Sequence, residues 1–206
     1  MDTARDAREA ALADACRLLG ACVRLPTPQL AASVADGSLA ASVRALLPHL
    51  GCSEERMRSV VRRLVLCQPA EPAAALTSLR REYTRLFAHP VKPIVPICES
   101  LFTSALRGED EKPLLMVNRR AMELDEVYRA AGYERTRSAA VPPDHMETEL
   151  AFLTVLLDKR ASADAAVFLE RYAGTWAPTF FALVEDHART PEYALFGSLG
   201  CACFER

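Results

Sequence analysis

The sequence predicts an all-α protein: a single globular bundle of about ten helices over residues 1–206, with a proline-rich hinge at about residues 89–97. Apolar residues recur at spacings of three and four along most of the chain, which is the period of a helix buried on one face. The alternation of β-branched and polar residues that would indicate strands is nearly absent. Helix-start signals divide the chain into segments of helical length.

The first half of the chain divides at prolines, a glycine and N-cap residues. Pro26 ends the first apolar stripe, and the pair Thr27-Pro28 has the N-cap and first-turn proline that start a helix. Serines at positions 38 and 53 are N-cap candidates, and Gly51 separates their helices. The predicted helices cover Asp2–Leu25, a short stretch from Pro28, Ser38–Leu50, Ser53–Cys67 and Pro72–His89.

A run of spaced prolines follows the fifth predicted helix. Pro90, Pro93 and Pro96 recur every three residues. Because proline lacks a backbone donor and disfavours a helical residue before it, this stretch is an extended connector. It is the predicted hinge.

The second half has its own start and stop signals. Asp144 is positioned to cap a helix, with Glu147 three residues later as the reciprocal partner of a capping box. Ser162 and Thr190 are further N-cap candidates, and Pro178 fits the first turn of a helix. The predicted helices cover Glu99–Leu106, Leu114–Ala131, a segment from Asp144 onward, Ser162–Tyr172, a segment from Pro178 and one from Pro191.

Composition excludes several classes of protein. The net charge is −2 with pI about 6.1, whereas a nucleic-acid binder needs a basic surface. Seven scattered cysteines are odd in number and too sparse for a disulfide scaffold, so free thiols in a reducing compartment are expected. The start lacks a signal-peptide pattern and no apolar run reaches 18 residues. We expect a cytoplasmic protein with peripheral or no membrane contact.

Catalytic and metal-binding motifs are not found in the sequence. The four histidines are isolated, and Cys201 and Cys203 provide only half of a zinc site. An acid–base pair of Asp144 and His145 is conceivable, but no nucleophile accompanies it. On the same helix, Glu149 shares a face with apolar residues, which is unusual both for a solvated face and for a core. No catalytic residue, metal or cofactor is predicted.

The fifth helix has a simpler interpretation. Tyr83 and Phe87 lie one turn apart beside Leu86, which is the periodicity of a buried stripe. Glu82 and Arg85 are spaced as an external ion pair, which would contribute little to stability.

Four segments together resemble the TorD/DmsD/NarJ-type family of redox-enzyme maturation chaperones. They read LRREYTRLFAHP, VPICESLF, PPDHMETELAFL and FLERYAGTWAPTFFALVEDHA, and they follow the order and spacing of the family across residues 79–188. The sequence departs from the family at Ile97, where a tryptophan is frequent, and at Tyr172, where a histidine is common.

The resemblance implies an all-helical cytoplasmic protein without a reaction of its own. Its expected partner is the N-terminal twin-arginine leader of a molybdopterin oxidoreductase catalytic subunit, which it holds until cofactor insertion. The resemblance also implicates a set of positions in leader binding: Tyr83, Leu86, Phe87, Pro96, Ile97, Asp144 and His145.

The charged and the apolar parts of such a site contribute differently to the binding free energy. Exposed ion pairs contribute about 0.2–1 kcal/mol each, whereas micromolar binding needs about −8 kcal/mol, so the apolar part of a leader must supply most of the affinity. We expect an apolar groove, acids that meet the leader arginines, and His145 orienting a carboxylate or a peptide carbonyl. The groove residues would be Tyr83, Leu86, Phe87, Ile97 and Phe102, and the acids Asp144, Glu147 and Glu99.

Two other functions remain open from sequence. One is a helical adaptor or assembly protein that binds the surface of a mature subunit. The other is a small enzyme using Asp144 and His145. The hinge predicts a monomer that can form a domain-swapped dimer, because such exchange needs an extended connector.

Overall fold

A computed structural model describes residues 2–67, 70–89, 93–108, 113–114, 118–135 and 141–205. These residues form eleven α-helices and one 3-10 turn and contain no strand, which confirms the all-α class. The helices are α1 (Asp2–Cys22), α2 (Pro28–Ala35), α3 (Ser38–Leu46), α4 (Glu54–Leu66), α5 (Pro72–Phe87), α6 (Glu99–Arg107), α7 (Arg119–Ala130), α8 (Met146–Asp158), α9 (Ser162–Arg171), α10 (Ala173–His187) and α11 (Pro191–Cys203), with the 3-10 turn at Leu47–His49.

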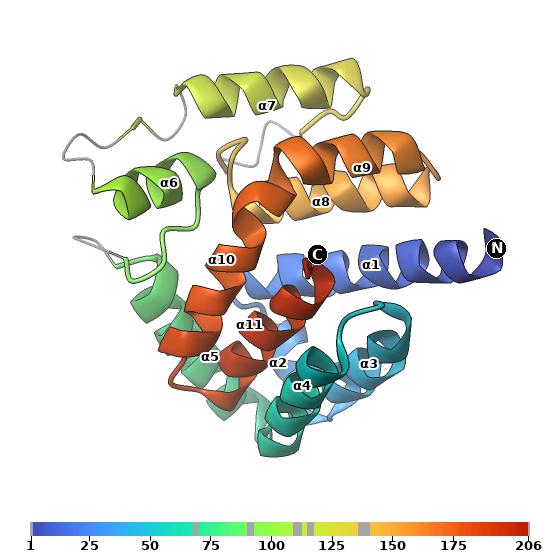
Figure 1. The fold of residues 1–206 in the computed structure, drawn as a ribbon. Coiled ribbons are helices and arrows are strands. Elements are labelled where there is room, and N and C mark those ends of the chain that lie inside the picture. The colour runs from blue at the N-terminus through green and yellow to red at the C-terminus, as the bar shows by residue number, and fades with distance from the viewer. Residues whose placement is uncertain are drawn as a thin grey trace.

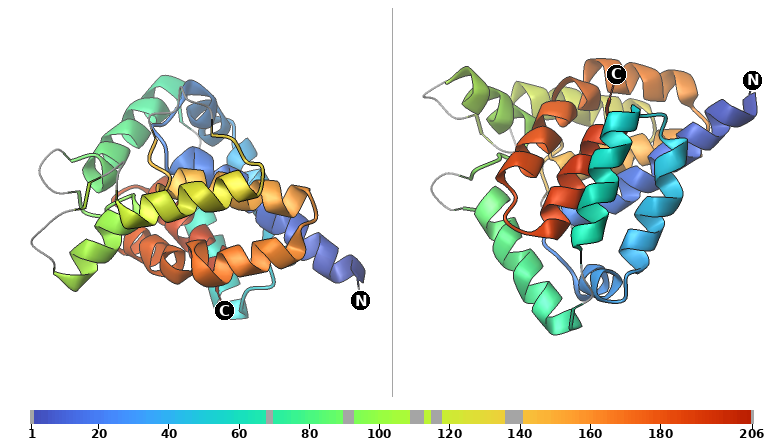
Figure 2. Two further views of the ribbon diagram at one scale, coloured as in Figure 1. Left: turned by 90° about the horizontal axis from the view of Figure 1, so that it is seen from above. Right: turned by 60° about the horizontal axis from the view of Figure 1, so that its bottom comes forward.

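The long α1 crosses the middle of the molecule and packs against α8 on one side and α11 on the other (Figure 1). α10 lies along α11, α4 covers another side of α11, and α2 packs on α5. α7 lies over α8 and α9, as the view from above also shows (Figure 2). Aromatic contacts join these three helices: the Tyr128 ring centroid lies 4.7 Å from that of Phe152 and 6.4 Å from that of Phe168.

α11 is the most completely buried helix of the described chain, with every residue from Tyr193 to Cys203 buried. A helix that is apolar all round needs neighbours on all sides, and α11 has them in α1, α4, α5 and α10. Two glycines allow close approach of α10. A Cβ at Gly200 would overlap the ring of Phe181, and a Cβ at Gly197 would overlap the backbone of Glu185.

The N-cap predictions at Thr27, Ser53 and Thr190 are confirmed. Their hydroxyl oxygens accept backbone N–H groups of the first turns of α2, α4 and α11, at 3.3, 3.3 and 3.5 Å. Each satisfies a donor that would otherwise have no intrahelical acceptor.

Some predicted boundaries were wrong. α1 ends at Cys22 rather than at Leu25. α10 begins at Ala173, so Pro178 lies in its interior and not at its start. The turn before Pro178 carries the buried Trp176. α7 begins at Arg119 after the N-cap Asn118, and not at residue 114.

The hinge falls partly outside the described residues, which omit residues 90–92. The part that is described is attached to α5, because the buried Val95 donates its N–H to the carbonyl oxygen of Leu86 at 2.9 Å. All seven cysteines are free thiols. Within the described ranges, no single helix is long and apolar enough to cross a membrane. Residues 28–35 and 38–49 together have the length and composition of a membrane span, but the two parts are bent by 80°.

Candidate functional site

Two of the resemblance segments are joined by main-chain hydrogen bonds. The N–H of Glu99 donates to the carbonyl oxygen of Asp144 at 2.7 Å, and the N–H of Met146 donates to that of Ile97 at 3.0 Å. These bonds form an isolated antiparallel bridge between Cys98 and His145. The start of α6 and the start of α8 therefore lie side by side, although they are more than 40 residues apart in sequence.

The proline pair before Asp144 is fixed by two hydroxyl groups. Tyr128 on α7 donates to the carbonyl oxygen of Pro143 at 2.8 Å, and Thr148 donates to that of Pro142 at 3.1 Å. Both bonds are buried, where a hydrogen bond is stronger than in water. The turn that carries Asp144 is thus held from both α7 and α8.

Asp144 does not cap α8, contrary to the capping-box prediction. Its fully buried carboxylate lies at the start of α6, where Oδ2 accepts the backbone N–H of Ser100 at 3.0 Å. Oδ1 has no hydrogen-bond partner among the described residues. In this structure Asp144 holds α6 against the turn before α8, and its carboxylate offers no surface to a ligand.

His145 is the N-cap of α8. The backbone N–H of Glu147 donates to its Nδ1 at 3.1 Å. Burial lowers the pKa of the imidazole from 6.5 to about 4, so the ring is neutral at physiological pH. No hydrogen bond joins the two side chains Asp144 and His145 in the described structure, so they are not arranged as an acid–base dyad.

Glu99 is neutralised by an arginine that the sequence analysis did not identify. Nε and Nη2 of Arg120 donate to the two oxygens of Glu99 at 2.6 and 2.7 Å. The guanidinium also donates to the carbonyl oxygen of Arg171 at 3.0 Å and lies 4.6 Å from the Tyr172 ring centroid. Burial raises the pKa of Glu99 while Arg120 opposes that rise. This bidentate geometry leaves Glu99 little capacity for another cation.

Glu149 is fully buried on the mixed face noted in the sequence. Both of its carboxylate oxygens lie 3.2 Å from Nε1 of Trp176, which donates to them. Burial, together with the nearby charge of Glu99, raises the pKa of Glu149 well above its usual value. The group is thus held toward its protonated form, which explains how an acid fits into an apolar face.

In the pair Glu82 and Arg85, the glutamate is buried and the arginine half-buried, so the prediction of an external pair was wrong. Arg85 donates to the Glu82 carboxylate at 2.8 and 2.6 Å. Glu82 also accepts the N–H of Arg189 at 2.6 Å, and Arg85 donates to the carbonyl oxygen of His187. The pair fastens α5 to the turn between α10 and α11.

The apolar residues of the expected groove separate into two groups. Leu86, Phe87 and Phe102 are buried. Phe87 stacks on Phe180 at 5.8 Å between ring centroids, and Phe102 lies 5.4 Å from Trp176. Leu86 and Phe87 are therefore part of the core, whereas Phe102 also lines a hollow between α6, the start of α7 and α10.

Tyr83, Pro96 and Ile97 form the second group and stay half-buried. The Tyr83 ring packs edge-on against Phe87, with 5.5 Å between ring centroids. Together with Glu147 they keep partly exposed side chains at the bridged segments. We refer to Tyr83, Pro96, Ile97 and Glu147 as the α5–α8 surface.

Glu147 is the acid on this surface. Burial raises its pKa, and the charge of Arg24 partly opposes the rise. Nη1 of Arg24 lies 3.9 Å from Oε1 of Glu147. Burial raises the pKa of Tyr83, and the negative charge of Glu147 adds to the rise, so the two side chains lie within electrostatic range of each other.

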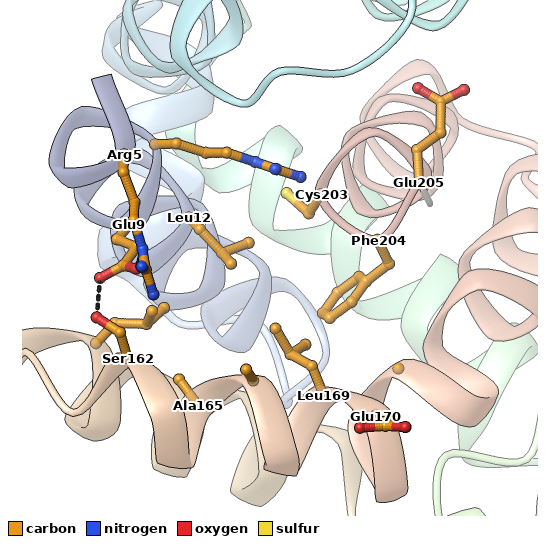
Figure 3. A pocket seen from close by; sticks show the side chains of 14 residues that line it. Arg5, Glu9, Leu12, Ser162, Ala165, Leu169, Glu170, Cys203, Phe204 and Glu205 are labelled. Carbon is orange, nitrogen blue, oxygen red and sulfur yellow. Dashed lines mark hydrogen bonds and ion pairs between the residues drawn. The ribbon is translucent and has the colours of Figure 1, made fainter. Parts of the chain in front are cut away.

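Two hollows lie away from the α5–α8 surface. One, of about 450 Å³, lies between the N-terminal part of α1, α9 and the end of α11, with Leu12, Leu169 and Phe204 as apolar walls (Figure 3). The other, of about 590 Å³, lies between α6, the start of α7 and α10. The linings of both exclude Tyr83 and Glu147. Within the described ranges, no group of three or more His, Cys, Asp or Glu residues could hold a metal ion.

The chain matches a known protein family. Residues 37–182 match the family model described as nitrate reductase delta subunit. This span includes the α5–α8 surface and the bridge between α6 and α8, whereas Arg24 precedes it. A search of curated proteins finds no match.

Proposed function

The chain belongs to the nitrate reductase delta subunit family, whose members are non-catalytic maturation chaperones of molybdoenzymes, and from that premise we propose that it binds the N-terminal twin-arginine leader of its client. The client is the catalytic subunit of a molybdoenzyme, with which the family associates. Binding in the cytoplasm keeps this subunit from export or assembly until its cofactor is inserted. The α5–α8 surface is the proposed docking site.

The observation that carries the proposal is the meeting of three distant segments at one place. The bridge between Cys98 and His145 places Ile97 beside Met146, and Val95 is bonded to Leu86. Because these contacts are main-chain hydrogen bonds at the starts of α6 and α8 and in the last turn of α5, they fix the backbone around Tyr83, Ile97 and Glu147. A site built on such rigid elements loses little conformational entropy when a flexible peptide binds to it.

Glu147 is the acid best placed to meet a leader arginine. Asp144 is fully buried and bonded to the start of α6, and Glu99 is already paired by Arg120. The side chain of Glu147 is 28 % exposed and has no bidentate partner in the described structure. The structure thus favours one of the three acids expected from sequence, and the other two support the fold.

The apolar part of a leader needs more contact area than Tyr83 and Ile97 alone offer. At about 25 cal/mol per Å², a gain of about 8 kcal/mol needs the burial of at least about 320 Å² of apolar surface. Ile94 and Leu25, which are 41 % and 56 % exposed, extend the available apolar area on the segments next to this surface. We expect a leader to cover these residues in addition to the α5–α8 surface.

Calorimetry with a synthetic leader tests the proposal. The probe is a peptide with two adjacent arginines followed by an apolar stretch, titrated into the folded chain. Ile97→Thr removes apolar contact while keeping the β-branched shape, and Glu147→Gln removes the charge. Both should weaken binding, Ile97→Thr more strongly. Glu126→Gln, an exposed position on α7, is the matched control for net charge. Unchanged affinity in both site variants would refute the docking site.

An exposed apolar strip on α4 favours a second candidate function. Val61 and Val65 lie one turn apart and are 46 % and 63 % exposed, which is unusual for large apolar side chains on the same helix face. Such a strip suits an adaptor that binds the surface of a mature subunit. Pull-down with client protein that has or lacks its leader separates the two functions. Equal recovery of both forms would favour the adaptor.

A further inference from the structure

The contact between Arg24 and Glu147 differs from the other ion pairs near the site. Its closest atoms are 3.9 Å apart, which is beyond hydrogen-bond distance, and the Arg24 side chain is 49 % exposed. No hydrogen bond ties the Arg24 guanidinium within the described part of the chain. By contrast, Glu82 and Glu99 each receive two arginine hydrogen bonds at 2.6–2.8 Å.

The surroundings of Glu147 suit a guanidinium. Its carboxylate is half-buried, and burial raises its pKa although the charge of Arg24 opposes the rise. Tyr83 and Tyr133 are both half-buried; burial raises the pKa of each, and the charge of Glu147 adds to the rise, so both rings lie within electrostatic range of this carboxylate. A carboxylate with aromatic neighbours attracts a guanidinium through charge, through paired hydrogen bonds and through the ring faces.

We propose that Glu147, with Tyr83 and Tyr133 within electrostatic range, is a guanidinium-binding site that Arg24 occupies in the unbound chain. This inference rests on the proposed function, because the incoming ligand is an arginine of the client leader, which enters by displacing Arg24. Arg24 lies in the connection between α1 and α2, so its side chain can leave without disturbing a helix.

The exchange has a consequence for specificity. When one guanidinium replaces another at the same carboxylate, little electrostatic free energy is gained. A peptide that offers only arginines therefore binds poorly, whereas a leader with an apolar stretch gains from the additional burial. Arg24 acts as a specificity-determining residue that rejects basic peptides without the apolar segment.

The test measures binding of two probes to three forms of the chain. The probes are the synthetic leader used above and a short peptide with the same two arginines but no apolar stretch. The forms are the unchanged chain, Arg24→Gln, and the matched control Arg62→Gln on the exposed side of α4. Arg24→Gln should bind the leader about twofold to fivefold tighter, because an exposed ion pair is weak. It should also bind the arginine-only peptide better, and Arg62→Gln should change neither affinity.

Two further measurements separate the possible failures. In the Glu147→Gln background, Arg24→Gln should have no effect on leader affinity. In the free chain, Arg24→Gln should raise the pKa of Glu147 followed by NMR. Equal or weaker leader binding by Arg24→Gln, or an unchanged pKa, overturns the role of Arg24 while leaving leader binding intact. If the leader binds to none of the folded forms, both the proposed function and this site are wrong.

Discussion

The neutral, buried His145 predicts a pH dependence of stability that one substitution can isolate. Its pKa is about 4 in the folded chain and 6.5 in the unfolded chain. Because the folded pKa is the lower of the two, the unfolded state takes up the proton first as the pH falls. The contribution of His145 to stability is therefore complete above pH 6.5 and is lost as the pH falls toward 4.

The size of this loss follows from the two pKa values. Linkage gives a loss of about 2 kcal/mol between pH 7 and pH 5, and about 3 kcal/mol between pH 7 and pH 4. A change of this size is a large fraction of the stability of a typical domain. Glu99, Glu147 and Glu149 act in the opposite direction, because burial raises their pKa values in the folded chain. As the pH falls, the folded state takes up these protons first and gains stability relative to the unfolded state.

The assay compares the chain with His145→Asn, because the difference between the two cancels the common carboxylates. Asparagine is a good N-cap whose side-chain oxygen can accept the N–H of Glu147, and it does not titrate in this range. Urea unfolding at intervals from pH 7 to pH 4 should show that the parent chain loses about 2 kcal/mol more than the variant by pH 5. Parallel curves for the two proteins, or an NMR pKa of His145 near 6.5, would refute the reasoning.

Two further predictions concern packing and a buried charge. Gly200→Ala should destabilise the chain by about 1–3 kcal/mol, because its Cβ meets the Phe181 ring, whereas Gly20→Ala in α1, where a Cβ meets nothing within 4 Å, should be neutral or stabilising by up to about 1 kcal/mol. Thermal unfolding decides this, and equal effects of the two changes would contradict the packing argument. Arg120→Met should cost about 3–5 kcal/mol near pH 7, because it leaves Glu99 buried without its cation. In a urea double-mutant cycle Glu99→Gln should recover much of that loss, and purely additive effects would show that the pair is not coupled.

Local signals in the sequence predicted most of the helices. Thr27, Ser53 and Thr190 cap their helices as expected, because a cap depends on residues three positions apart. Pro178 does not start α10, because the helix already begins five residues earlier, at Ala173, where Trp176 and its neighbours are packed in the core. Here tertiary contacts override local propensity.

The roles of the site residues were harder to predict from the sequence, because they depend on contacts between residues that are far apart in the chain. Either Asp144 or His145 could have capped α8, and the choice depends on Ser100, which lies 44 positions away and binds the aspartate. Glu99 pairs with Arg120, which lies 21 residues further along the chain, and no helical periodicity connects the two positions. The isolated acid at position 149 was the one visible signal, since a carboxylate on an apolar face requires a buried donor.

The burial of α11 has a consequence for how the chain reaches its folded state during synthesis. α11 fills the space bounded by α1, α4, α5 and α10, so these earlier helices lack a shared partner until residue 203 has left the ribosome. A nascent chain that stops before Pro191 would expose the apolar faces of these four helices and would itself need protection from aggregation. The chain therefore becomes competent only after α11 has been synthesised and has packed against these helices.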